Sequence, residues 1–343
     1  MSTILCDLGD WITYASRAPL TPIPKDEADR VLREATCAAR QAHAVRSAPW
    51  WQRAQGLART LSGLPDSREP DVSLVIGHEQ QRRAGKGLRA HCLPAFSLQD
   101  GAIWRIEEPI DLNEPAYVVA PAIYLLLRAR FLDLPGLVAT AATLCSSYGP
   151  RLDPNRALAE RPPLLTAESL RSFADALPAN TTKGGLLRQA ADLTPDCSRS
   201  PMETALALFL SLPVCHGGFG LPLPVLNPPI DLESDAQRVL GGQRRIYIDL
   251  LWPEARLGIE YDSNEHHSSR QKHLADERRQ LAADIAGIEL VPLTAATVMD
   301  ETAFSLAAER LARRLGKPFS WDLCHLEKRR ALRARLLGPH RFW

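Results

Sequence analysis

The chain has 343 residues with 41 Lys or Arg and 40 Asp or Glu, so any affinity for nucleic acid must come from local basic patches rather than net charge. Its seven cysteines form no CxxC pair, and their odd number argues against a disulfide framework and favours a cytoplasmic setting. The apolar stretch 118–145 is interrupted by Arg128, Arg130, Asp133 and Pro135, short of the roughly 20 apolar residues that a membrane span needs.

The N-terminal part of the chain is predicted to hold a helical region followed by a small sheet. Apolar residues recur at helical spacing within residues 25–61. Short β-type runs follow, and helical patterns return at 121–131 and 136–145; the β-type runs lie at 72–76, 87–91, 103–106 and 117–119. We predict a helical region over residues 1–70 and a small α+β region over 71–150, for which a regulatory or DNA-binding role is expected.

A basic turn separates the first two β-type runs. It contains Arg82, Arg83 and Lys86. A turn of this composition is usually a solvated hairpin tip, and contact with the phosphates of a nucleic acid is the functional alternative.

Four prolines between residues 150 and 163 mark a connector, and two helices are predicted after it at 166–177 and 184–193. We treat residues 151–199 as a linker with helices. Ser200, Pro201 and Glu203 then have the pattern of a helix start, in which Ser is the cap, Pro the first helical residue and Glu the partner that completes a capping box.

The residues with the clearest chemistry are carboxylates on two predicted strands. Asp249 lies in the β-rich run 246–253, and Glu260 and Asp262 share one face of the run 257–262 because side chains alternate along a strand. The short connection 252–256 suits a hairpin that brings the two strands side by side. Solvent-facing acids on a hairpin are ordinary, so spacing alone leaves a surface hairpin and a metal site equally open.

Clustered carboxylates favour a hard divalent cation. Mg²⁺ prefers oxygen ligands and is commonly held by one or two carboxylates together with waters and substrate phosphate. Such an ion stabilises charge on a phosphoryl group and lowers the pKa of the attacking water. We therefore expect Mg²⁺ or Mn²⁺ as the cofactor if this hairpin is a site.

Further elements complete the C-terminal part, for which we predict a domain over residues 200–343. A histidine pair, His266 and His267, follows the second strand, and a helix over 270–286, a strand over 288–293 and a helix over 301–315 come next. The tail contains Lys328, Arg329 and Arg330. Contact with phosphates and a solvated helix face are equally open for these basic residues.

Taken in order, these features resemble the PD-(D/E)XK nuclease superfamily. The order comprises a helix with Glu203, a strand with Asp249 before Trp252-Pro253, a strand with Glu260-x-Asp262, His266, Asp276-x-x-Arg279, Gly287 and a following β-run. The branch that is most similar contains domains related to very-short-patch-repair endonucleases, and the resemblance covers about residues 200–315. It implies an α/β fold class, α+β over the whole chain, with a restriction-endonuclease-like mixed sheet flanked by helices. It also implies metal-dependent cleavage of DNA phosphodiester bonds.

The resemblance also assigns roles by position. Asp249 and Glu260 would be the metal carboxylates, and Asp262 would stand where many members have lysine. Without that lysine, His266 or His267 would have to orient the water; spacing favours His266. The resemblance further gives supporting roles to Glu203, Asp276 and Arg279, although a capping box explains Glu203 and a surface ion pair explains the other two.

The N-terminal region resembles another family. Residues 71–144, with paired β-type runs and Arg89-x-His91, are similar to the middle region of abortive-infection type IV antitoxins, which are DNA-binding regulators. This implies an alternative in which the nuclease fold is a non-catalytic scaffold of a DNA-binding regulator. An interaction module acting on RNA is a third hypothesis.

Overall fold

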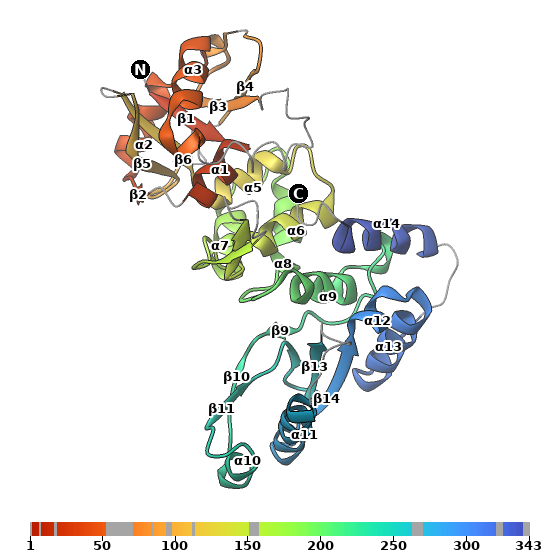
Figure 1. The fold of residues 1–343 in the computed structure, drawn as a ribbon. Helices are drawn as coiled ribbons and strands as arrows, with labels where there is room; N and C mark the ends of the chain where they lie inside the picture. The colour runs from red at the N-terminus through yellow and green to blue at the C-terminus, as the bar shows by residue number, and fades with distance from the viewer. Residues whose placement is uncertain are drawn as a thin grey trace. The chain divides into compact units, whose positions relative to one another are not determined.

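The computed structural model describes residues 2–6, 8–16, 19–52, 71–83, 85–93, 98–111, 114–150, 158–262, 270–319 and 325–338. The chain forms two compact units (Figure 1). The N-terminal unit contains residues 1–144 and 148–192, and the C-terminal unit contains residues 145–147 and 193–342. Each unit has its own sheet and its own buried core.

A six-stranded mixed sheet forms the centre of the N-terminal unit. The strands lie in the order β2-β5-β6-β1-β3-β4. β1 runs parallel to β6 and β3 parallel to β4, whereas the other neighbours are antiparallel. β4 is the last strand in the order and is therefore an edge strand. The strands are β1 (Thr3–Cys6), β2 (Leu20–Pro22), β3 (Val72–Ile76), β4 (Leu88–Cys92), β5 (Ile103–Asp111) and β6 (Glu114–Val119), and a separate pair is formed by β7 (Tyr148–Pro150) and β8 (Leu158–Glu160).

Helices pack against the central strands of this sheet and bury them. The Tyr14 hydroxyl donates to the carbonyl oxygen of Val119 at 2.6 Å, and Trp11 Nε1 donates to the Tyr124 hydroxyl at 2.7 Å, so the first helix is joined to β6 and to the helix after it. Every residue of β3 is buried, as expected for a strand covered on both faces. The helices are α1 (Leu8–Ser16), α2 (Lys25–Glu34), α3 (Ala39–Ser47), α5 (Pro121–Arg128), α6 (Leu134–Leu144), α7 (Ala167–Ala176) and α8 (Gly184–Asp192).

The predicted division at residue 70 does not coincide with a boundary between compact units. Strands β1 and β2 come from the predicted helical region, yet they lie in the same sheet as β3 to β6. The physical reason is that β1 is a four-residue strand whose residues are all buried, so it lacks the alternation by which a strand is recognised in a sequence.

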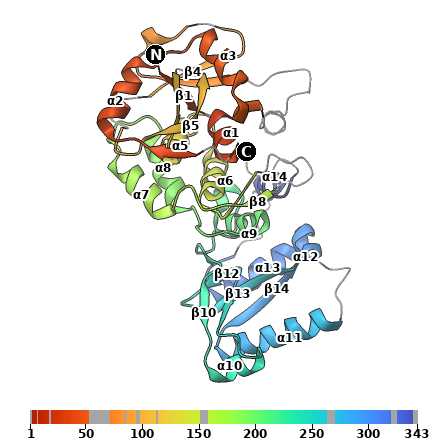
Figure 2. The same cartoon turned by 60° about the vertical axis from the view of Figure 1, so that its left-hand side comes forward.

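A four-stranded mixed sheet forms the centre of the C-terminal unit. It has the order β14-β13-β12-β9, and Figure 2 shows β12, β13 and β14 side by side. β9 (Val225–Leu226), β12 (Leu250–Trp252) and β13 (Leu257–Asp262) are antiparallel neighbours, and β14 (Glu289–Thr294) is parallel to β13. The hairpin predicted between the two acidic strands is confirmed. β10 (Pro229–Asp231) and β11 (Arg245–Tyr247) form a separate two-stranded ribbon.

The helices of this unit pack in two clusters. Ala282 and Ala283 of α11 pack against Ile246, Ile248 and Leu290, which places α11 against the sheet and the ribbon. An aromatic cluster fixes α9, because Phe209 stacks on Phe304 of α13 at 5.2 Å between ring centroids and Phe219 contacts both rings. The helices are α9 (Pro201–Ser211), α10 (Ser234–Val239), α11 (Arg270–Ile285), α12 (Ala295–Met299), α13 (Glu301–Arg314) and α14 (Leu326–Leu337).

Helix α9 begins where the sequence predicted, but with half of the predicted capping box. Ser200 Oγ accepts the N–H of Glu203 at 3.2 Å. The Glu203 carboxylate accepts the N–H of Arg199 at 2.8 Å, where a capping box would use the N–H of Ser200. The Glu203 carboxylate therefore does not complete the capping box.

Replacing Ser200 with alanine should lower the free energy of unfolding of the C-terminal unit by about 1 kcal/mol, because the N–H of Glu203 loses its acceptor. Urea denaturation followed by circular dichroism measures the change. Ser200→Thr should retain most of the stability, since threonine also caps. Equal losses in both variants would contradict the capping role.

These results confirm the predicted α/β class, with mixed sheets flanked by helices. In the described part of the chain, no helix is long and apolar enough to cross a membrane.

Candidate functional site

Asp249 immediately precedes β12 and lies beside Glu260 of β13. The β12–β13 ladder pairs Leu250 with Ile259, and extending this register by one residue brings Asp249 opposite Glu260. Directly opposite residues of an antiparallel pair share a face, with Cβ atoms about 4.5–5.5 Å apart. Asp249 Oδ2 accepts the N–H of Tyr261 at 2.8 Å, which holds this carboxylate against β13 beside Glu260.

Glu203 approaches the same row of residues from α9. The β9–β12 ladder pairs Leu226 with Leu250, and the N–H of Asn227 donates to the carbonyl oxygen of Asp249 at 3.1 Å. Asn227 Nδ2 in turn donates to Glu203 Oε2. Glu203 is only 7% exposed, so its carboxylate is held inside the unit and linked to the strand position of Asp249.

Two arginines lie next to these carboxylates. Arg279 of α11 donates to Glu260 Oε1 at 2.8 Å and also to the carbonyl oxygen of Tyr247. The guanidinium carbon of Arg199 lies 4.3 Å from the centroid of the Tyr247 ring, a cation–π contact. Arg199 and Tyr247 are both exposed, and they lie at the solvent-facing edge of the site.

Burial raises the pKa of all three carboxyl groups. For Glu260, burial is the largest cause, the charge of Arg279 opposes it and the charges of Asp249 and Glu203 add to it, which brings the pKa to about 7. Burial also raises the pKa of Asp249 against the hydrogen bond from Tyr261, and raises that of Glu203 against its own hydrogen bonds. The charge of Asp249 raises the pKa of Glu203, and the charges of both raise the pKa of Glu260, so the three carboxyl groups are electrostatically linked.

Carboxylate oxygens are the donor type that a hard divalent cation prefers. The oxygen donors are carboxylates in a partly buried site where their charges repel one another, and a cation would relieve that repulsion. Among the described residues, no group of three or more His, Cys, Asp or Glu is arranged to hold a metal ion. A pair of carboxylates completed by waters and substrate phosphate is nevertheless the usual protein contribution to a Mg²⁺ site, and Asp249 and Glu260 are of that type.

The other predicted site residues fall in different places. Asp262 is half-buried, two residues further along β13 from Glu260 and on the same face. Asp276 is exposed on α11, whereas Arg279, three residues later, reaches Glu260, so of these two the contact with the carboxylates comes from the arginine. His266 and His267 lie outside the described residues.

Of the three basic residues for which phosphate contact was predicted in the C-terminal tail, Arg329 is buried. All three belong to helix α14, in which Arg329 is 5% exposed with its guanidinium carbon 4.3 Å from the centroid of the Phe219 ring. Arg329 is therefore a core residue and unsuited to phosphate contact. Arg330 pairs with Glu301 at 3.1 Å, and Lys328 is exposed.

The predicted basic turn of the N-terminal unit is exposed. Arg82 forms an ion pair with Glu79 at 2.8 Å, and Arg83 donates to backbone carbonyl oxygens. Lys86 lies in the tight turn that precedes β4. All three residues are exposed.

Sequence reasoning missed Arg199, Asn227 and Tyr247. Tyr247 precedes Asp249 by two residues in the predicted strand, so strand alternation could have placed it on the same face. Asn227 has φ of 50°, a left-handed conformation that asparagine tolerates and that no spacing rule reveals. No sequence pattern marks Arg199, because its place in the site depends on a tertiary contact with Tyr247.

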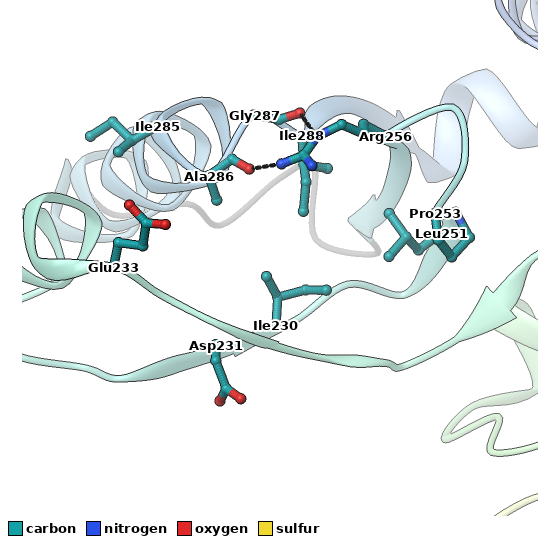
Figure 3. Close-up of a pocket in the computed structure, with 10 residues that line it drawn as sticks. All are labelled: Ile230, Asp231, Glu233, Leu251, Pro253, Arg256, Ile285, Ala286, Gly287 and Ile288. Atoms are coloured by element: carbon teal, nitrogen blue, oxygen red, sulfur yellow. Dashed lines mark hydrogen bonds between the residues drawn. The ribbon is translucent and has the colours of Figure 1, made fainter.

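A hollow of about 500 Å³ lies elsewhere in this unit (Figure 3). Its wall includes Ile230, Leu251 and Ile288, and Arg256 closes one side by donating to the carbonyl oxygen of Gly287 at 2.8 Å. None of the three site carboxylates is among the described residues that line it. The three carboxylates therefore lie outside this hollow.

Comparison with known proteins gives two relatives that match most of the chain. They are "Uncharacterized protein MT2308" of Mycobacterium tuberculosis strain CDC 1551 / Oshkosh and "Uncharacterized protein Rv2248" of strain ATCC 25618 / H37Rv. Each is 27% identical over 271 residues, which cover 76% of this chain and 93% of the relative. No family model and no solved structure matches the chain.

Proposed function

We propose that the C-terminal unit is a PD-(D/E)XK-like nuclease unit that hydrolyses DNA phosphodiester bonds with Mg²⁺ or Mn²⁺. The observation that carries the proposal is the register that sets Asp249 opposite Glu260, with Glu203 and Arg279 tied to the same row of residues. The element order also supports it, because β12, β13, α11 and β14 follow one another as strand, strand, helix and strand, and α9 precedes them with β9, β10, α10 and β11 in between. A role in defence or repair would follow from such an activity.

Two carboxylates and two arginines of the site have roles in this proposal. Asp249 and Glu260 would hold the cation, which when bound stabilises charge on the phosphate and acidifies a bound water. Arg279 orients the Glu260 carboxylate through its hydrogen bond and offsets part of the negative charge. Arg199, at the solvent-facing edge of the site, would bind a phosphate oxygen of the substrate, because guanidinium groups form charge-assisted hydrogen bonds to phosphates.

A second candidate is a DNA-binding regulator that keeps the nuclease fold as a non-catalytic scaffold. It is favoured by Asp262, which occupies the position where a lysine would orient the water. The ion pair between Arg279 and Glu260 also favours it, since the arginine already balances a carboxylate that a cation would otherwise need.

Cleavage assays separate the two candidates. Supercoiled plasmid and single-stranded DNA are incubated with Mg²⁺ or Mn²⁺ and with the wild type, Glu260→Gln or Glu254→Gln. Glu254 is exposed in the turn of the same hairpin, so its substitution is a matched control. Metal-dependent nicking by the wild type and the control, but not by Glu260→Gln, is the expected result.

No nicking by the wild type, or equal nicking by all three proteins, would contradict the nuclease assignment. A mobility shift of the plasmid without nicking would then support the regulator. RNA substituted for DNA in the same assays tests the third hypothesis.

A further inference from the structure

The N-terminal unit contains a basic pocket at the edge of its sheet. The pocket is a hollow of about 680 Å³ between the edge strand β4, the short helix of residues 79–81 and the turn that follows α5. Its size lies in the range of small-molecule sites. Five of the lining residues are arginines: Arg82, Arg83, Arg89, Arg128 and Arg130.

Arg82 and Arg89 of the basic pocket form ion pairs with acidic residues. Glu79 is the acidic residue among the described lining residues and pairs with Arg82, while Asp71 pairs with Arg89 at 2.9 Å. Both ion pairs are exposed, and such pairs contribute little, so a phosphate can compete for these guanidinium groups at low cost. Arg83 donates to neutral carbonyl oxygens, which do not cancel its charge. The pocket therefore favours an anionic ligand.

An aromatic ring lies at the mouth of this cationic surface. Phe131 is 64% exposed, the highest value among the large apolar side chains of the described residues. Its ring meets the ring of His91 edge to face, with centroids 5.9 Å apart and planes at 88°. This contact joins the turn after α5 to β4 and orients the Phe131 ring. An exposed, oriented ring beside several arginines is a platform for stacking a planar group that carries phosphate.

We propose that the basic pocket binds a nucleotide unit of single-stranded nucleic acid, with phosphates at Arg83 and Arg130 and a base stacked on Phe131. A single strand is favoured over a duplex because the base must be unstacked before its face can contact the phenyl ring. The combination of guanidinium groups for the backbone and an aromatic ring for a base gives affinity without reading sequence. This site does not depend on the carboxylates of the C-terminal unit.

Fluorescence anisotropy with a fluorescein-labelled oligodeoxythymidine tests the proposal. All proteins are full-length and contain Glu260→Gln, so that cleavage cannot consume the probe. Phe131→Ala should weaken binding by about 5- to 100-fold, the usual effect of losing one stacked base. Arg130→Gln should weaken binding and reduce the slope of log affinity against log salt by about one.

Two matched variants control for loss of exposed side chains. Leu306→Ala removes an apolar side chain that is 52% exposed, and Arg30→Gln removes a guanidinium group that is 62% exposed. Neither should change the affinity. If Phe131→Ala binds as tightly as Leu306→Ala, or a duplex competes as well as the single strand, the proposal is overturned.

The result is independent of the proposed nuclease activity, because nicking of plasmid by the protein without Glu260→Gln is read in a separate assay. Binding that disappears in the pocket variants while nicking of plasmid persists would support the pocket and the nuclease together. Binding that survives both pocket substitutions would refute the pocket and leave the nuclease assignment unaffected.

Discussion

Asp249→Asn is expected to reduce metal-dependent DNA cleavage by about 100- to 1000-fold while the C-terminal unit stays folded. The loss follows because a bound cation provides several kcal/mol of charge stabilisation, and each 1.36 kcal/mol corresponds to tenfold in rate. The fold should survive because the asparagine Oδ1 can still accept the N–H of Tyr261, the hydrogen bond that holds Asp249 against β13. Only the negative charge is removed.

Three measurements check this expectation. Plasmid nicking gives the rate, calorimetry with Mn²⁺ gives the cation affinity, and thermal denaturation monitors the fold. Asp235→Asn is the matched control, because Asp235 is 72% exposed on α10 and should leave all three values unchanged. Undiminished Mn²⁺ affinity in Asp249→Asn would show that the cation is not held by this carboxylate.

The hairpin is the part of the site that could be predicted from the sequence. Alternation along residues 257–262 and the short connection after Trp252 determine the register, and that register alone brings Asp249 opposite Glu260. The start of α9 was equally predictable, because a cap, a proline and an acidic residue act locally. Local rules therefore account for the strands and for the beginning of the helix that supplies Glu203.

Tertiary placement determined the rest, and the sequence could not show it. Asp276 and Arg279 lie one turn apart on α11, and only the packing of that helix decides that Arg279 reaches Glu260. Arg329 belongs to a run of basic residues that is typical of a solvated surface, yet it is buried against Phe219. For β1, complete burial removed the alternation that identifies a strand. In each case a long-range contact overrides the local pattern.

In the absence of divalent cations, the stability of the C-terminal unit should fall as the pH rises from about 4.5 to about 7. The pKa of Glu260 is raised from 4.5 to about 7 by burial, so over this range the folded protein keeps a proton that the unfolded chain has lost. The contribution is fully present below pH 4.5 and is lost above pH 7. The shift corresponds to at most about 3–4 kcal/mol, and because a quarter of the side chain is exposed we expect about 1–3 kcal/mol.

Comparing the wild type with Glu260→Gln isolates this effect from other titrations. Glutamine keeps an oxygen that can accept the hydrogen bond of Arg279 but binds no proton in this range, so the variant should be more stable than the wild type at pH 8 and similar to it near pH 4. Urea denaturation in EDTA at several pH values measures the difference. A difference that does not change with pH would contradict the raised pKa of Glu260.

Addition of Mn²⁺ should reverse the order of stability at pH 8. The cation binds the folded wild type and stabilises it by mass action, whereas Glu260→Gln lacks the charge that would hold the ion. A structural carboxylate behaves differently, because its removal lowers stability with or without the ion. A variant that gains stability in EDTA, loses the stabilisation by Mn²⁺ and no longer nicks DNA would therefore identify Glu260 as a cation ligand whose charge costs the protein stability when no cation is bound.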